Sequence, residues 1–224
     1  GFSPHLRIHG IITPIAEMEP LSSEAIEYMA DEIMRDDNRT QFRDEWDTDF
    51  AYNLNKVGRF RVNCFRDMRG AGMVLRLIPE KIPSIDELRL PKIIREFCHM
   101  SKGLILVTGP TGSGKSTTLA AMIDYINKQR AEHIITIEDP IEFVHTPAKC
   151  IINQREVHRD TTSFARALRA ALREDPDIVL VGEMRDLDTV EIALETAETG
   201  HLVLATVHTN TAATTIDRVI DKFP

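Results

Sequence analysis

The sequence predicts an α/β protein in which a mostly parallel sheet follows a smaller α+β domain. Two observations carry this prediction. Over residues 104–223, apolar runs with strand character alternate with helical patterns, which is typical of a parallel sheet covered on both faces. Before them, three stretches alternate apolar and polar residues and are joined by short polar turns. We expect a first domain over 1–78, a linker over 79–91 and a second domain over 92–224.

The first domain begins with a strand pair or bent strand over residues 5–15, in which Gly10 suits a turn or bulge. Ser22 is a candidate N-cap for a helix whose apolar stripe runs over 26–34. A second, short helix is expected over 38–46.

An antiparallel meander completes the first domain, with strands at 50–54, 60–64 and 73–77. Apolar residues occupy one face of these strands. Arg61 and Arg76 lie on the opposite, polar face. From the residues alone, a solvated strand charge is the favoured interpretation of both arginines.

The second domain alternates strands with helices. Pro91 suits the first position of a helix that ends before Gly103, a candidate C-cap. The expected strands are 104–108, 134–137, 178–181 and 202–207, and helical apolar stripes lie within 119–126, 164–172, 187–199 and 216–223.

A phosphate-binding pattern, G-x-x-x-x-G-K-[ST], lies between the first of these strands and its helix. Its glycines let backbone N–H groups curl around an anion, and the helix N-terminus adds its dipole. Lys115 is expected to reach the β- and γ-phosphates of ATP, and Ser116 to ligate Mg²⁺. An ordinary glycine-rich turn is the alternative, which the strand–loop–helix context disfavours. The candidate binding residues are Gly109, Pro110, Thr111, Gly112, Ser113, Gly114, Lys115, Ser116 and Thr117.

Polar residues also follow the other three predicted strands, at the edge of the sheet where ligands of open parallel sheets bind. Taken singly, each is as well explained as a helix cap, a loop charge or a structural histidine. Their convergence favours a site that holds a metal ion, activates water and senses phosphate charge. Gly182 replaces the aspartate usual before an acid such as Glu183. The residues are Glu138, Asp139, Glu142, Glu183, Arg185, Asp186 and His208.

The composition is that of an ordinary soluble globular protein, with 42% hydrophobic and 28% charged residues. The net charge of −8 disfavours a nucleic-acid partner. The three cysteines form no C-x-x-C pair, so no zinc site or disulfide framework is indicated, and a reducing, cytoplasmic compartment is expected. No apolar run approaches the length of a membrane span. Both ends look cut, so we expect a fragment of a longer protein.

Four motifs resemble those of the secretion ATPase superfamily of type II secretion and type IV pili. G-P-T-G-S-G-K-S (109–116) resembles its Walker A motif, T-I-E-D-P-I-E (136–142) its Asp box, L-R-E-D-P-D-I-V-L-V-G-E-M-R-D (172–186) its Walker B motif and T-G-H-L-V-L-A-T-V-H-T (199–209) its His box. The superfamily has glycine where Gly182 stands. Within it, the chain is most similar to type IV pilus retraction ATPases, through R-F-R-V-N (59–63), R-G-A-G (69–72), N-Q-R-E-V-H-R-D-T (153–161) and G-E-M-R-D (182–186).

This resemblance implies a PAS-like first domain, a RecA-like second domain and a homohexameric ring. It implies a cytoplasmic ATPase, peripheral at the inner membrane, that acts on an inner-membrane platform protein. Hydrolysis would power pilus retraction and twitching motility, with pilin withdrawn indirectly through the platform.

The resemblance also assigns roles to single residues. Thr117 would contact the α-phosphate. Glu142 would be the catalytic base, and Glu183 would support Mg²⁺ and its water shell. His201 and His208 would report the γ-phosphate. Arg61 and Arg76, from the first domain, would reach that phosphate when the two domains close.

Several alternatives stay open. Within the superfamily these are a pilus-extension or type II secretion ATPase, which usually reads G-E-I-R-D, and an accessory retraction paralogue. A RecA-like DNA motor is disfavoured by the acidic balance of both domains. A nucleotide-binding module without turnover is disfavoured by the presence of Glu142 and Glu183.

Overall fold

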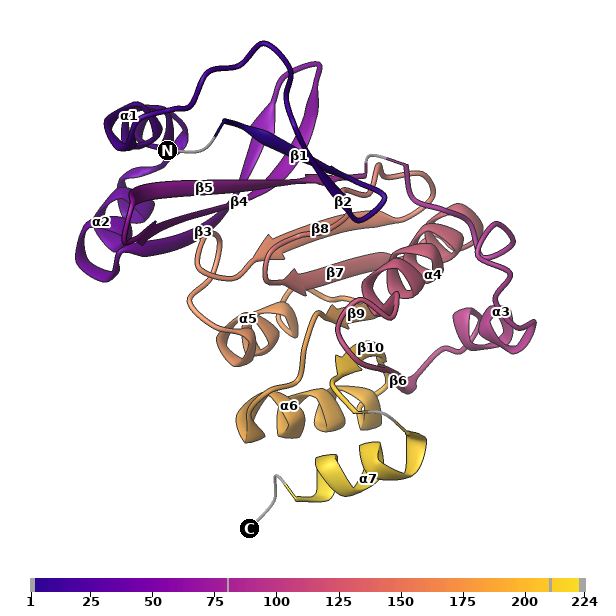
Figure 1. Ribbon diagram of the computed structural model, residues 1–224. Helices are drawn as coiled ribbons and strands as arrows, with labels where there is room; N and C mark the ends of the chain where they lie inside the picture. The colour runs from indigo at the N-terminus through magenta and orange to yellow at the C-terminus, as the bar shows by residue number, and fades with distance from the viewer. Residues whose placement is uncertain (1–2, 80, 210, 222–224) are drawn as a thin grey trace. The chain divides into compact units, whose positions relative to one another are not determined.

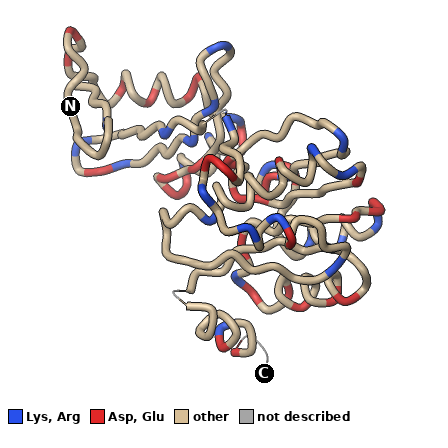
Figure 2. Tube along the Cα trace, turned by 90° about the vertical axis from the view of Figure 1, so that its right-hand side faces the viewer, with Lys and Arg blue, Asp and Glu red and all other residues tan. Residues whose placement is uncertain are grey.

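The computed structural model describes residues 3–79, 81–209 and 211–221 (Figure 1). The chain forms two compact units, Gly1–Ile78 and Pro79–Pro224. Each unit has its own sheet and its own buried core. Acidic and basic residues are interspersed along the trace of both units (Figure 2).

The first unit is an α+β structure, as predicted. Its helices are α1 (Ser23–Ile33) and α2 (Asp36–Glu45), and its strands are β1 (His5–Ile8), β2 (Ile11–Pro14), β3 (Asp47–Leu54), β4 (Gly58–Asp67) and β5 (Gly70–Ile78). β1 and β2 form a separate antiparallel hairpin, and β3, β4 and β5 form the meander in that order. Helix α1 packs against the sheet through Ala30. Met34, the C-cap residue that follows α1, joins Phe50 and Val62 in the core.

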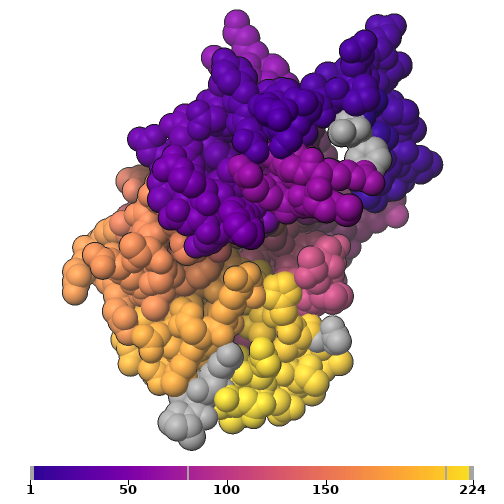
Figure 3. Space-filling view, turned by 60° about the vertical axis from the view of Figure 1, so that its left-hand side comes forward, coloured from indigo at the N-terminus to yellow at the C-terminus, as the bar shows by residue number. Residues whose placement is uncertain are grey.

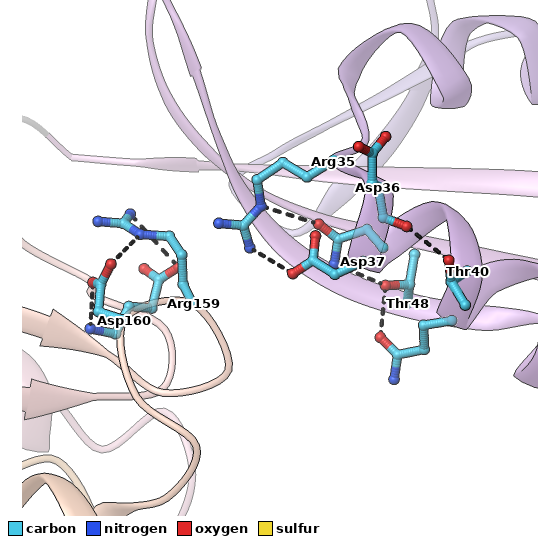
Figure 4. A network of polar contacts seen from close by, with 10 residues as sticks. Arg35, Asp36, Asp37, Thr40, Thr48, Arg159 and Asp160 are labelled. Carbon is cyan, nitrogen blue, oxygen red and sulfur yellow. Dashed lines mark hydrogen bonds and ion pairs between the residues drawn. The ribbon is translucent and has the colours of Figure 1, made fainter.

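Local side-chain hydrogen bonds set the helix ends of this unit. The Ser22 side chain accepts from the backbone N–H of Ala25, so the predicted N-cap of α1 is confirmed. Two aspartates, Asp36 and Asp37, occupy the first turn of α2, where their negative charge interacts favourably with the helix dipole. Thr40 donates to the backbone carbonyl of Asp36 at 2.9 Å, and Arg35 pairs with Asp37 at 3.5 Å (Figure 4).

The second unit holds a five-stranded parallel sheet in the order β6-β10-β9-β7-β8. The strands are β6 (Gly103–Thr108), β7 (His133–Glu138), β8 (Ile151–Glu156), β9 (Ile178–Val181) and β10 (Leu202–Val207). The helices are α3 (Ile93–Cys98), α4 (Lys115–Gln129), α5 (Phe164–Ala171), α6 (Leu187–Glu198) and α7 (Ala212–Ile220). The predicted end of α7 at residue 223 lies outside the described residues.

Helices cover both faces of this sheet, as the alternating pattern predicts. Successive residues of each strand point to opposite faces. Ile134, Ile178 and Leu204 pack with α3 and α4 in one cluster. Ile135 and Val179 pack with α5 and α6 in the other. The outer surface of α7 is seen in Figure 3.

Strand β8 is absent from the sequence-based prediction. Its sequence, I-I-N-Q-R-E, has only two apolar residues at its start, so neither strand alternation nor a buried run is visible. It forms because its backbone pairs with β7 in parallel register, from His133 opposite Ile151 to Glu138 opposite Glu156. As the edge strand of the sheet, it needs less apolar sequence than the central strands.

The segment predicted as a linker packs on the second unit. Ile85 is buried, and Leu88 and Leu90 lie against the core beside α4. Ser84 and Glu87 form a capping box, in which the backbone N–H of each residue donates to the side chain of the other, at 2.7 Å and 3.1 Å. No helix in the described part of the chain is long and apolar enough to cross a bilayer.

The core of the sheet makes a direct stability prediction. Ile135 is 0% exposed on β7, whereas Ile151 is 67% exposed on β8 of the same sheet. We expect Ile135→Ala to lower the free energy of unfolding by about 2–5 kcal/mol, because it removes buried methyl groups and leaves a cavity. Ile151→Ala, the matched control, should change it by less than about 0.5 kcal/mol. Chemical denaturation measures both, and equal losses would contradict the described core.

Candidate functional site

The phosphate-binding pattern forms a loop between β6 and α4, and its glycines adopt conformations that other residues disfavour. Gly109, Gly112 and Gly114 have φ angles of 153°, 78° and 92°. A Cβ atom added at Gly112 or Gly114 would meet nothing within 4 Å, so the space beside the loop is open. Helix α4 begins directly after the loop, at Lys115, and Ser116 and Thr117 lie in its first turn. The loop and the helix N-terminus therefore have the form of an anion cradle.

The ammonium group of Lys115 is held inside this loop. Its side chain is buried, and Nζ donates to the backbone carbonyls of Gly109 at 2.9 Å and Pro110 at 3.0 Å. Nζ also lies 3.4 Å from Nδ1 of His208, which follows β10. Because an ammonium only donates, Nδ1 is the acceptor and the Nε2 atom of His208 carries the proton.

Contacts continue from His208 to the residues after β9. His208 Nε2 lies 3.3 Å from Oε1 of Glu183, and Oε2 of Glu183 accepts from Arg185 at 2.7 Å. We call the connected series Lys115–His208–Glu183–Arg185 the polar relay. Its members follow three neighbouring strands of the sheet, β6, β10 and β9. With two permanent cations and one carboxylate, the polar relay suits an anionic ligand.

Glu183 remains ionised in this setting. Burial alone raises its pKa, but the hydrogen bond and charge of Arg185, together with His208, hold the pKa of Glu183 below its usual value. The pKa of Arg185 is raised in turn, mainly by its hydrogen bond to Glu183. Arg185 was recognised in the sequence as part of an acidic cluster without a role. The two-residue spacing from Glu183 is the signal that could have indicated this ion pair.

The presence of glycine rather than aspartate at position 182 has a steric explanation. A Cβ atom there would lie 3.1 Å from the carbonyl oxygen of Ile137 and 3.2 Å from Cα of Glu138. Both are backbone atoms of the neighbouring strand β7, so they cannot rotate away. The Gly182 N–H donates to that same carbonyl at 2.7 Å. An aspartate at this position would force the two strand ends apart, and glycine lets them close.

A second group of carboxylates lies at the end of β7 and in the loop after it. Oε1 of Glu138 accepts from Thr136 Oγ1 at 2.6 Å and from Gln154 Nε2 at 3.3 Å. Burial raises the pKa of Glu138, and the nearby charge of Glu142 adds to this effect, against hydrogen bonds that lower it. The backbone of Glu142 acts on Glu138 to lower its pKa, while the Glu142 side chain is exposed. The two glutamates are therefore neighbours with different environments.

The structure places His201 at the opposite end of β10 from His208 and the phosphate-binding loop, and its role at the γ-phosphate stays a prediction. His201 precedes β10 and its backbone carbonyl accepts from Gly103 at the opposite edge of the sheet. Its Nδ1 lies 3.0 Å from the carbonyl of Thr196. The six-residue strand between the two histidines separates them by about 20 Å.

Arg61 and Arg76 belong to the first unit. They lie directly opposite each other on β4 and β5, on the polar face of the meander as predicted. Arg61 donates to the Asp49 carboxylate at 2.7 Å. Like charges directly opposite across strands are destabilising, and the Asp49 carboxylate offsets part of this charge.

Strand, glycine-rich loop and helix, with a lysine held in the loop, define a P-loop protein on a parallel α/β sheet. The comparisons agree. The family described as "Type II/IV secretion system protein" matches residues 5–221. The chain therefore belongs to this family.

Two curated relatives and one solved structure show which members of the family the chain resembles. The chain is 54% identical over its whole length to the "Type IV pilus retractation ATPase PilT" of Pseudomonas aeruginosa and covers 65% of it. It is 51% identical over 99% of its length to a "Twitching motility protein" of Neisseria gonorrhoeae and covers 59% of it. The crystal structure of the "Pilus Retraction Motor PilT and Bound ADP" matches 99% of the chain, at a TM-score of 0.95 and 52% identity, and is covered to 65%. The chain thus spans less than two thirds of the length of these relatives.

The polar relay predicts a pH-dependent stability. Because the pKa of Glu183 is lowered in the folded state, its ionised form stabilises the fold above the unfolded pKa, near 4.5. This contribution is lost as pH falls through the folded pKa. Glu183→Gln should therefore lower the free energy of unfolding at pH 7 and change it little at the acid end. Denaturant titrations at several pH values measure the difference, and a constant difference would contradict it.

Proposed function

We propose that the protein is an ATPase motor that powers the retraction of type IV pili. The polar relay is the observation that carries this proposal, because it joins the lysine of the phosphate-binding loop to an ionised carboxylate and a histidine at the same edge of the sheet. The names of the two relatives, a retraction ATPase and a twitching motility protein, support retraction as the work that is done.

The residues present fit ATP and Mg²⁺. The loop 109–117 would bind the phosphates, with Lys115 leaving the carbonyls of the loop to reach the β- and γ-phosphates. Ser116 would ligate Mg²⁺, and Glu183 would hold its water shell. Mg²⁺ favours such sites, with few protein ligands and several waters, and would neutralise phosphate charge. In the described part of the chain no group of three His, Cys, Asp or Glu forms a ready metal site, so phosphate oxygens would complete the coordination.

Glu142 is proposed as the base that takes a proton from the attacking water. It is exposed in the loop that follows the carboxyl end of β7. His208 is proposed to sense the γ-phosphate, because it lies between Lys115 and Glu183 and must respond when either moves. Thr117 is proposed to contact the α-phosphate.

Arg61 and Arg76 are proposed to contact the γ-phosphate when the first domain (1–78) closes on the ATPase domain (92–224) about the linker (79–91). The anion would offset the repulsion between two opposed arginines. Arg61 would exchange its bond to Asp49 for one to phosphate. Hydrolysis and phosphate release would remove the charge that both domains hold, and the domains would open.

The motor is proposed to work as a homohexameric ring in the cytoplasm, peripheral at the inner membrane. Opening and closing around the ring would act on an inner-membrane platform protein, and pilin would be withdrawn through it.

Replacing the proposed base tests hydrolysis. Glu142→Gln in the full-length chain should lower the turnover of ATP by about 10²–10⁴-fold, because the water loses its proton acceptor. Affinity for ADP should stay within about twofold, since the phosphate-binding loop is untouched. A phosphate-release assay and a nucleotide titration measure these quantities. Glu191→Gln, an exposed glutamate on α6, is the control. Wild-type turnover in Glu142→Gln would remove Glu142 from this role.

Replacing one arginine tests domain closure. Arg76→Ala should lower turnover by about a thousand-fold, as for other arginines that stabilise a γ-phosphate in the transition state, while ADP affinity is kept. Arg43→Ala, an exposed position on α2 of the same unit, should have no effect. Steady-state kinetics of full-length hexamers measure both variants. If Arg76→Ala turns over normally, the two domains do not share the γ-phosphate.

A further inference from the structure

The loop that carries Glu142 is ordered by buried side chains rather than by regular backbone pairing. Residues 139–150 join β7 to β8 without a helix or strand. Burial nevertheless alternates along it. Ile141, Phe143 and His145 are buried, and Glu142 and Val144 between them are exposed. Buried backbone groups need hydrogen-bond partners, so something other than a sheet ladder must supply them here.

Strand β8 supplies two of these partners, from consecutive positions on one face. Gln154 bonds to the part of the loop that follows Glu142 in the chain. Its Nε2 donates to the carbonyl of Phe143 at 2.8 Å, and its Oε1 accepts from the N–H of His145 at 2.8 Å. Glu156, which is buried, accepts from the N–H of Ile141 at 3.1 Å. Together these bonds hold the backbone on both sides of Glu142.

Helix α4 supplies the third partner. Asn127 is buried, and its Nδ2 donates to the carbonyl of Thr146 at 2.9 Å. Its Oδ1 accepts from the N–H groups of Ala148 at 2.9 Å and Cys150 at 3.3 Å. This amide therefore fixes the second half of the loop to the helix that begins at the phosphate-binding loop.

Gln154 differs from the other two residues because it also reaches the carboxylate of Glu138, at the end of β7. Its Nε2 lies 3.3 Å from Oε1 of Glu138. Gln154 thus contacts both the backbone that follows Glu142 and the carboxylate that precedes it in the chain.

We propose that Gln154 is a positioning residue that fixes the direction of the Glu142 carboxylate, with Glu156 and Asn127 holding the ends of the same loop. This inference rests on the proposed role of Glu142 as base. It gives a physical role to part of N-Q-R-E-V-H-R-D-T, the signature at 153–161. Asp160 of that signature accepts from the Glu156 N–H at 2.9 Å and pairs with Arg159 at 3.0 Å, which orders the turn after β8 (Figure 4).

The test compares two variants of the full-length chain on the same strand. Gln154→Leu keeps the size of the side chain and removes all of its hydrogen bonds. Asn153→Leu, the control, changes an exposed neighbour on the other face of β8. We expect Gln154→Leu to lower kcat by about 10–100-fold, because a displacement of about 1 Å at a reacting group has this effect. KM and ADP affinity should change less than about twofold. Unchanged kcat, or a loss confined to KM, would overturn the proposal.

A double variant shows whether Gln154 acts through Glu142. In a Glu142→Gln background, Gln154→Leu should cause no further loss of kcat, because the group that it positions is absent. A loss as large as in the wild-type background would mean that Gln154 acts elsewhere and would overturn the proposal. Normal turnover in Glu142→Gln alone would instead show that the proposed base is wrong, and the inference would fall with it.

Hydrogen exchange of the unaltered full-length chain tests the geometry even if Gln154→Leu does not fold. The amides of Ile141 and His145 should exchange at least about tenfold more slowly than that of Val144, whose side chain is exposed. Exchange of His145 as fast as Val144 would show that Gln154 does not hold the loop.

Discussion

The parallel pairing of β10 with β6 on one side and β9 on the other is the interaction on which the site depends. It sets Val207 opposite Thr108 and Ala205 opposite Val181. His208 therefore emerges beside the phosphate-binding loop, and Glu183 emerges beside His208. The strand order, rather than the chain order, decides these neighbours, because Lys115 and His208 are 93 residues apart in sequence. A shift of one residue in either pairing would turn every side chain to the other face and break the polar relay.

Contacts between neighbouring strands explain two residues that look unremarkable alone. Glycine suits position 182 because β9 and β7 approach so closely that a Cβ atom would lie 3.2 Å from Cα of Glu138. Thr206 donates to the carbonyl of Gly182 at 2.5 Å, which ties β10 to the turn that carries Glu183. Backbone contacts between the strands therefore hold the edge that carries the ionised groups of the site. Preorganisation of this kind is what makes charge at a site effective in catalysis.

Most of the fold follows from patterns that are local in the sequence. The Ser22 cap, the meander and the central strands of the parallel sheet were predicted because capping chemistry and apolar periodicity act over a few residues. Strand β8 was missed because its stability comes from β7, which is distant in sequence. The predicted strand over 202–207 already places His201 and His208 at opposite edges of the sheet, and the structure has them there.

The sequence by itself determined the phosphate-binding loop, the family and the types of residue at the strand ends, because these depend on short motifs and on the rule that parallel strands end at one edge. Tertiary structure alone decided which of those residues touch. It joined Glu183 to Arg185 and His208, placed His201 at the other end of β10, and revealed Gln154, Glu156 and Asn127 around the Glu142 loop. The physical reason is that a buried polar side chain takes its partner from whatever the packing brings within about 3 Å, and packing is not written in any local pattern.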